Sequence, residues 1–141
     1  MSNIFWDTML FVYWLEGNQQ YGARVDEIFQ RMQERGDHLC TSALAYGEIL
    51  VRPYKAQAQE AADAIHRFFR GPLVEVLPFT DGAALHYARI RSRYAISPAD
   101  AVHLACAADA GTDLFLTNDA SLLGKAVPGI HFIAGLNTDL F

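Results

Sequence analysis

Short apolar segments alternate along the chain with longer segments in which apolar residues recur every three or four positions. Apolar runs of three or four residues are typical of buried strands, and the sequence has five, at residues 3–6, 38–40, 74–77, 114–116 and 131–133. The longer segments predict amphipathic helices, as at Val25, Ile28, Phe29 and Met32. Strands that alternate with helices predict an α/β fold around a mostly parallel sheet.

Four carboxylates occur where a fold of this kind binds ligands. In an open parallel sheet, ligands bind beyond the carboxyl ends of the strands. Asp7 follows the first predicted strand, and Asp119 follows the fourth. Asp100 opens a predicted helix, and Glu48 lies inside another. These four acids are the candidate site residues.

Each aspartate also has a simpler structural interpretation. Aspartate is among the residues most favoured at the start of a helix, so Asp7 and Asp119 could each cap the helix that follows. Ser97, with Asp100 three residues later, forms the pattern of a capping box. Taken singly, each aspartate is explained by helix capping alone.

Glu48 is different, because its helix is apolar nearly all round. We therefore expect its carboxylate to be buried or nearly so, and a buried acid needs a cationic or hydrogen-bonding partner. One interpretation is a salt bridge to an arginine such as Arg52 or Arg89. The other is a place among the acids of the site.

The four acids would meet if the first and fourth strands are neighbours in the sheet. Carboxylates in one cleft repel, each pair by about 3 kcal/mol at about 5 Å and an effective dielectric constant near 20. Such a cluster requires raised pKa values or a bound cation. Oxygen ligands without a set of His and Cys side chains select Mg²⁺ or Mn²⁺ rather than zinc. A cluster of this kind can hold one or two ions that activate water and bind a phosphodiester.

Four motifs resemble those of the PIN domain family, and at this length especially those of its VapC-type toxins. They are Asp7-Thr8 after the first strand, Gly-Glu48-Ile-Leu, Pro-Ala-Asp100-Ala-Val-His-Leu-Ala-Cys-Ala, and Thr117-Asn-Asp119 after the fourth strand. The last two in tandem are specific, and the resemblance covers essentially the whole chain. One departure is Met9, where many members carry a small polar residue.

The resemblance implies a three-layer α/β/α sandwich with strand order 3-2-1-4-5, formed by a single domain over residues 1–141. It also implies a Mg²⁺- or Mn²⁺-dependent endoribonuclease, the toxin of a toxin–antitoxin pair, whose cognate antitoxin blocks the site. By motif position, the residues of the metal site would be Asp7, Glu48, Asp100 and Asp119, with Thr117 as the nearby hydroxyl. In such a site a metal-activated water attacks the RNA phosphodiester, and no side-chain nucleophile is needed.

The net charge of −5 has to be considered together with its distribution. An acid excess argues against nucleic-acid binding, because affinity for a polyanion comes from Lys and Arg. Residues 52–93, however, hold seven basic and four acidic side chains, whereas both flanking segments are acidic. We therefore predict that Arg52, Arg89 and Arg93 contact RNA beside the acids, although a solvated helix face explains these arginines about equally well.

The histidines and cysteines are less informative. His103 lies three residues after Asp100 on the same helical face, so it could contact the metal or the scissile phosphate. It could equally be a neighbour whose ring is fixed by a hydrogen bond. The other histidines are too scattered for a zinc site. Cys40 and Cys106 lie in apolar surroundings, which predicts buried free thiols rather than a disulfide.

Membrane and secreted classes are not indicated. The sequence has no uncharged apolar run approaching the roughly 18 residues of a membrane span, and its start lacks the features of a signal peptide. We therefore expect a cytoplasmic protein that binds no membrane, and aromatic and alanine-rich helix faces predict a homodimer. Two other functions stay open: a non-catalytic protein-binding module of the same fold, and a structure-specific DNA nuclease of the wider superfamily.

Overall fold

The structure, a computed structural model, describes residues 1–140. Its strands are β1 (Asn3–Trp6), β2 (His38–Ser42), β3 (Glu75–Leu77), β4 (Leu114–Leu116) and β5 (Phe132–Ala134). Its helices are α1 (Thr8–Leu15), α2 (Gly22–Arg35), α3 (Ala43–Lys55), α4 (Gln59–Phe69), α5 (Asp81–Arg93), α6 (Pro98–Asp109) and the short 3₁₀ helix η1 (Ala120–Leu122). All five predicted strands are present, and their ends differ from the expected ones by at most two residues.

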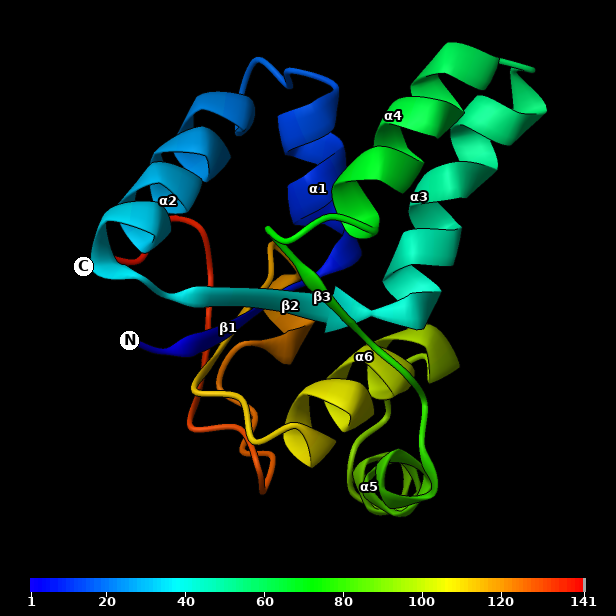
Figure 1. Cartoon of the computed structure of the whole chain (residues 1–141). Coiled ribbons are helices and arrows are strands. Elements are labelled where there is room, and N and C mark those ends of the chain that lie inside the picture. Colours follow the sequence, from blue (N-terminus) through cyan, green and yellow to red (C-terminus); the bar gives the residue numbers. More distant parts are fainter. Residues whose placement is uncertain (141) are drawn as a thin grey trace.

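The five strands form one sheet in the order β3-β2-β1-β4-β5, and every neighbouring pair is parallel. Helices α1 to α4 lie on one face of this sheet, whereas α5 and α6 lie on the other (Figure 1). The predicted three-layer α/β/α sandwich with strand order 3-2-1-4-5 is therefore confirmed.

The central strand β1 supplies side chains to both layers. Ile4 and Trp6 pack into the core beneath α1 and α2, while Phe5 points to the opposite face and packs against α6. Phe5 also stacks on Phe115 of β4, with ring centroids 4.8 Å apart. Because β1 is covered on both faces, its three buried positions are all apolar and show no polar alternation.

The sheet order brings together the chain segments that follow β1 and β4. Trp6 of β1 lies opposite Leu116 of β4, so the next residue of each strand, Asp7 and Thr117, emerges at the same edge of the sheet. The backbone N–H of Asp7 donates to the carbonyl of Leu116 at 2.9 Å. The sheet therefore fixes the separation of the two loops before any side chain contributes.

Both cysteines are buried in the core. Cys40 and Cys106 are buried free thiols, as predicted. Burial raises the pKa of Cys40 to about 12 and that of Cys106 to about 11. In residues 1–140, no helix is both long and apolar enough to span a membrane.

Candidate metal and nuclease cleft

Asp7 is a buried acid at the carboxyl end of β1. Its Oδ1 accepts the backbone N–H of Thr8 at 2.8 Å and so caps α1, while its Oδ2 accepts the hydroxyl of Thr117 at 2.7 Å. Only 7% of its surface is exposed. The residue is therefore a helix cap, as the simpler interpretation held, and its two oxygens are also tied to both loops of the sheet edge.

Burial raises the pKa of Asp7 above its ordinary value of 3.8. The hydrogen bond from Thr117, the attraction of the His103 ring and the hydrogen bond from Thr8 each lower this pKa, but the net effect is still a raised value. The negative charge of Asp100 raises it further. Asp7 and Asp100 thus interact electrostatically, and a cation placed between them would relieve the repulsion.

Asp119 lies on the neighbouring loop and is exposed. Its backbone N–H donates to the hydroxyl of the buried Thr117 at 3.0 Å, and its Oδ1 accepts both the N–H and the hydroxyl of Ser121. These last two bonds cap η1. Thr117 therefore links Asp119 to Asp7, since one hydroxyl serves both residues.

Asp100 lies in the first turn of α6 and is half-buried. The helix begins as the sequence predicts, with Pro98 in its first turn and the Ser97 hydroxyl accepting the Asp100 N–H at 3.1 Å. This cap orients the first turn of α6, and Asp100 with it, toward the edge of the sheet where Asp7 lies.

Glu48 corrects one expectation, because 37% of its side chain is exposed. The apolar residues of α3 that suggested burial include Leu44 and Val51, which are themselves exposed. Its partners also differ from the expected arginines. Its Oε1 accepts the Thr8 hydroxyl at 2.8 Å and the Nε2–H of His103 at 2.9 Å.

His103 is buried, and both of its ring nitrogens have partners. Since an ionised carboxylate can only accept, Nε2 carries the proton that binds Glu48. In the neutral ring, Nδ1 then accepts the hydroxyl of Ser42, 2.7 Å away. The Ser42 oxygen in turn accepts the N–H of Ala45 and caps α3. The ring is thus fixed by hydrogen bonds, which is one of the two predicted interpretations.

These side chains line one cleft of about 270 Å³ at the carboxyl edge of the sheet. It brings together five of the predicted site residues, namely Asp7, Glu48, Asp100, His103 and Asp119. Thr117 lies beneath it through its bond to Asp7. Sequence reasoning missed Ser42 and Asn118. Of the two, only Ser42 left a signal, as a serine two residues after a predicted strand.

The side chains of the cleft have the chemistry to bind a divalent ion, but they do not form a complete coordination site. The lining acids are hard oxygen donors of the kind that Mg²⁺ and Mn²⁺ prefer. Within the part of the chain that the structure describes, however, no three His, Cys, Asp or Glu side chains are grouped closely enough to hold a metal ion. Asp7 and Asp100, which interact electrostatically, form the inner pair, and binding would require the exposed Asp119 to move toward them.

The predicted RNA-binding arginines do not line the cleft. Arg52 of α3 forms an ion pair with Glu16. Arg89 and Arg93 of α5 line a separate hollow of about 170 Å³ with Tyr94. The structure therefore divides the three arginines between two different surfaces.

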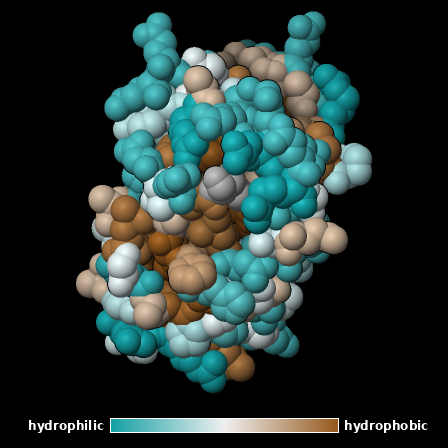
Figure 2. All heavy atoms as spheres, turned by 90° about the vertical axis from the view of Figure 1, so that its left-hand side faces the viewer, coloured by the Kyte–Doolittle hydropathy of each residue, from teal (hydrophilic) through white to brown (hydrophobic). Residues whose placement is uncertain are grey.

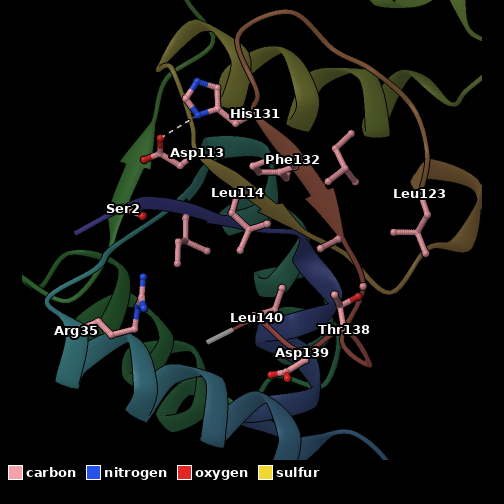
Figure 3. Close-up of a pocket in the computed structure, with 14 residues that line it drawn as sticks. Ser2, Arg35, Asp113, Leu114, Leu123, His131, Phe132, Thr138, Asp139 and Leu140 are labelled. Atoms are coloured by element: carbon pink, nitrogen blue, oxygen red, sulfur yellow. Dashed lines mark ion pairs between the residues drawn. The ribbon is translucent and has the colours of Figure 1, made fainter.

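A larger hollow of about 690 Å³ contains none of the predicted acids. It extends from the amino ends of β4 and β5 along the whole of β5 to Gly135. At the amino ends Asp113 forms an ion pair with His131, and apolar residues such as Leu114 and Phe132 line the wall (Figure 3). On this side of the molecule, hydrophobic residues gather in a depression between hydrophilic regions (Figure 2). Size alone therefore does not identify the chemical site.

Comparison with known proteins agrees with the α/β/α fold described above. The model of the PIN domain family matches residues 4–126. A search of curated protein sequences found no match.

Several solved structures share this fold at low sequence identity. VapBC2 from Rickettsia felis, bound to a promoter DNA fragment, is 14% identical over 94% of this chain and 98% of that chain, with a TM-score of 0.75. DNA-bound VapBC from Salmonella typhimurium is 21% identical over 96% and 99%, with a TM-score of 0.68. VapC20 from Mycobacterium tuberculosis, described as a sarcin–ricin loop cleaving toxin, is 18% identical over 79% and 86%, with a TM-score of 0.62.

The family match begins inside β1 and ends just after η1, so it includes every acid of the cleft. The strand order, the shared fold and the convergence of Asp7, Asp100 and Asp119 at one sheet edge agree with it. The chain belongs to the PIN domain family.

Proposed function

We propose that the protein is a Mg²⁺- or Mn²⁺-dependent endoribonuclease and the toxin of a toxin–antitoxin pair. One observation carries the proposal: four acids from four separate segments of a PIN domain line a single cleft. Helix capping explains the aspartates one at a time, but it does not explain why they share a cleft with Glu48. The raised pKa of Asp7 supports a site suited to a cation.

In this proposal Asp7 and Asp100 hold one or two ions, and Glu48 and Asp119 complete the ligand set. A divalent ion held there would supply an activated water and neutralise charge on the phosphodiester. The residues of the chain orient the ligands. Thr117 fixes Asp7 through its hydroxyl, while His103 and Thr8 fix Glu48.

RNA and an antitoxin are the proposed partners. Among the structures of the same fold, VapC20 is described as cleaving the sarcin–ricin loop, and others are toxin–antitoxin complexes. Those descriptions belong to those proteins and here motivate the choice of substrate. A cytoplasmic location follows from an RNA substrate, and a homodimer stays a prediction that analytical ultracentrifugation can check.

The direct test is cleavage of pooled cellular RNA with Mg²⁺, with Mn²⁺ and with EDTA. We expect cleavage by the wild-type protein with either ion, none in EDTA, and none for Asp100→Asn. The matched control is Asp109→Asn, at the far end of the same helix, where the carboxylate accepts the Thr80 hydroxyl. Asp100→Asn that cleaves at the wild-type rate would contradict the proposal.

The two alternatives predict different outcomes of simple experiments. A non-catalytic module whose acids are only caps should gain little thermal stability from Mn²⁺, whereas a carboxylate site should be stabilised by the ion. A DNA nuclease should cleave branched DNA in preference to RNA under the same conditions. The fold is compatible with both, so these measurements separate the functions.

A further inference from the structure

A group of cations lies beside the cleft in two segments that lack acids. Residues 82–99 and residues 120–138 contain no Asp or Glu. Arg93 lines two adjoining hollows, one of about 170 Å³ that it shares with Arg89 and one of about 270 Å³ that it shares with Lys125. We call Arg89, Arg93 and Lys125 the basic surface.

The cations of the basic surface differ from other arginines of the chain in their partners. In residues 1–140, none of the three forms an ion pair with a carboxylate, whereas Arg24 and Arg52 each have one. Unneutralised cations gathered around a hollow attract a polyanion and raise its rate of association. The basic surface is therefore a candidate binding site for phosphate groups.

Tyr94 holds the basic surface together. The guanidinium of Arg93 and the ammonium of Lys125 each lie 5.4 Å from the centre of its ring, within cation–π range. Its hydroxyl donates to the carbonyl of Ala126 at 2.9 Å and accepts the N–H of Ala126 at 3.1 Å. The end of α5 is thus fastened to the loop after η1, and two like charges are kept close together.

The basic surface adjoins the cleft through two short connections. Lys125 donates to the carbonyl of Ser121, and Ser121 donates to Asp119 of the cleft. On the other side, only three residue steps separate Tyr94 from Ser97, the cap of the helix that carries Asp100, a span of at most about 11 Å. Lys125 is therefore linked to Asp119 through one residue, Ser121, and the end of α5 is linked to the start of α6, which carries Asp100.

We propose that the basic surface binds the phosphate backbone of the RNA strand where it leaves the cleft past Asp100 and Asp119. This inference rests on the proposed ribonuclease function and gives its substrate a direction on the protein. RNA is favoured over a protein partner because none of the exposed large apolar residues lies among the lining residues of the two hollows. An acidic segment of an antitoxin is the competing occupant.

The test compares charge reversals on one helix and its neighbouring loop. Arg93→Glu and Lys125→Glu alter the basic surface, whereas Arg91→Glu is a matched control, since Arg91 contacts Tyr87 and lines neither hollow. Binding of a fluorescein-labelled single-stranded RNA is followed by anisotropy in EDTA over a range of KCl concentrations. Cleavage of the same RNA with Mg²⁺ gives kcat and KM, and circular dichroism checks folding.

We expect Arg93→Glu and Lys125→Glu each to weaken RNA binding about tenfold and to raise KM with kcat unchanged. The slope of log affinity against log salt should fall by about 0.7 for each phosphate that the variant no longer neutralises. Affinity, slope and KM equal to those of Arg91→Glu would overturn the inference. Unchanged RNA binding with loss of antitoxin binding would also overturn it. If the wild-type protein cleaves no RNA but these variants lose RNA binding, the proposed function fails and the basic surface stands.

Discussion

The two sides of the cleft are built differently. On the side of β2, Glu48 is held by His103 and Thr8, and the nearest cation of α3, Arg52, is neutralised by Glu16. On the side of β4, Asp119 is held only by residues of its own loop, and Lys125 of that loop has no carboxylate partner in the described chain. The side of β2, which we call the fixed side, therefore holds its acid through other helices and has its cation neutralised, whereas the side of β4, the open side, leaves positive charge available.

The difference suggests that the two sides of the cleft bind different kinds of partner. Exposed apolar residues of α3, such as Leu44 and Val51, accompany the fixed side and suit contact with a protein. Unneutralised cations accompany the open side and suit contact with a polyanion. Asp7 and Asp100 lie between the two sides. We therefore expect substitutions of these inner acids to have larger effects than substitutions on either side.

The largest effect is expected at the centre. Asp7→Asn keeps the size of the side chain and can still accept the N–H of Thr8, but it removes a charged ligand from the inner pair. We expect cleavage of RNA to fall about a thousandfold or more, which corresponds to roughly 4 kcal/mol in activation free energy. Single-turnover cleavage of a labelled RNA measures it, and a loss of less than tenfold would remove Asp7 from the site.

The next effect is expected on the fixed side, at His103. His103→Ala frees Glu48, and loss of a residue that orients a metal ligand typically costs about 10- to 100-fold in metal affinity or activity. His103→Gln can still donate a hydrogen bond to Glu48 and should recover most of the loss. The readouts are kcat and the affinity for Mn²⁺. A glutamine variant as defective as the alanine variant would show that His103 does more than orient Glu48.

A small effect is expected from the neutralised cation. Arg52→Ala removes a charge that is already paired with Glu16, so KM for RNA should change less than about twofold, in contrast to Arg93→Glu. Steady-state kinetics of both variants make the comparison. A KM increase for Arg52→Ala as large as that for Arg93→Glu would contradict the claim that only the open side binds RNA.

The smallest expected effect concerns stability and pH. Because the pKa of Asp7 is raised in the folded state, its protonated form stabilises the fold below about pH 3.8, and this contribution is lost as the pH rises through the folded pKa. Asparagine is neutral throughout. Asp7→Asn should therefore melt at a higher temperature than the wild type at pH 7 in EDTA, and the two melting temperatures should converge below pH 4. A variant less stable at pH 7 would contradict the sign.

The positions of Asp7 and of the helix caps could be predicted because each leaves a local pattern in the sequence. Strand β1 is buried on both faces and is therefore a recognisable apolar run, which locates Asp7 at its end. The strand order rested on the family resemblance, because pairing between distant segments leaves little local signal. Helix caps such as Ser97 were readable for the opposite reason, since a cap is a local interaction.

The expectation about Glu48 was wrong because apolar spacing does not reveal whether a helix face is covered. Leu44 and Val51 follow a helical repeat, yet both are exposed on α3. The partners of Glu48 were also hidden from sequence reasoning. Ser42, Glu48 and His103 meet only because β2 and α6 pack together, and no spacing along the chain encodes that contact.

Binding of Mn²⁺ without RNA tests the central claim, that the acids of the cleft form a cation site. Isothermal titration calorimetry of the wild type, Asp7→Asn, Asp100→Asn and the control Asp109→Asn gives the comparison. We expect the wild type and Asp109→Asn to bind Mn²⁺ with the same affinity, and the two cleft variants to bind at least about tenfold more weakly. Equal binding by Asp100→Asn and the wild type, or no binding by the wild type, would contradict the account.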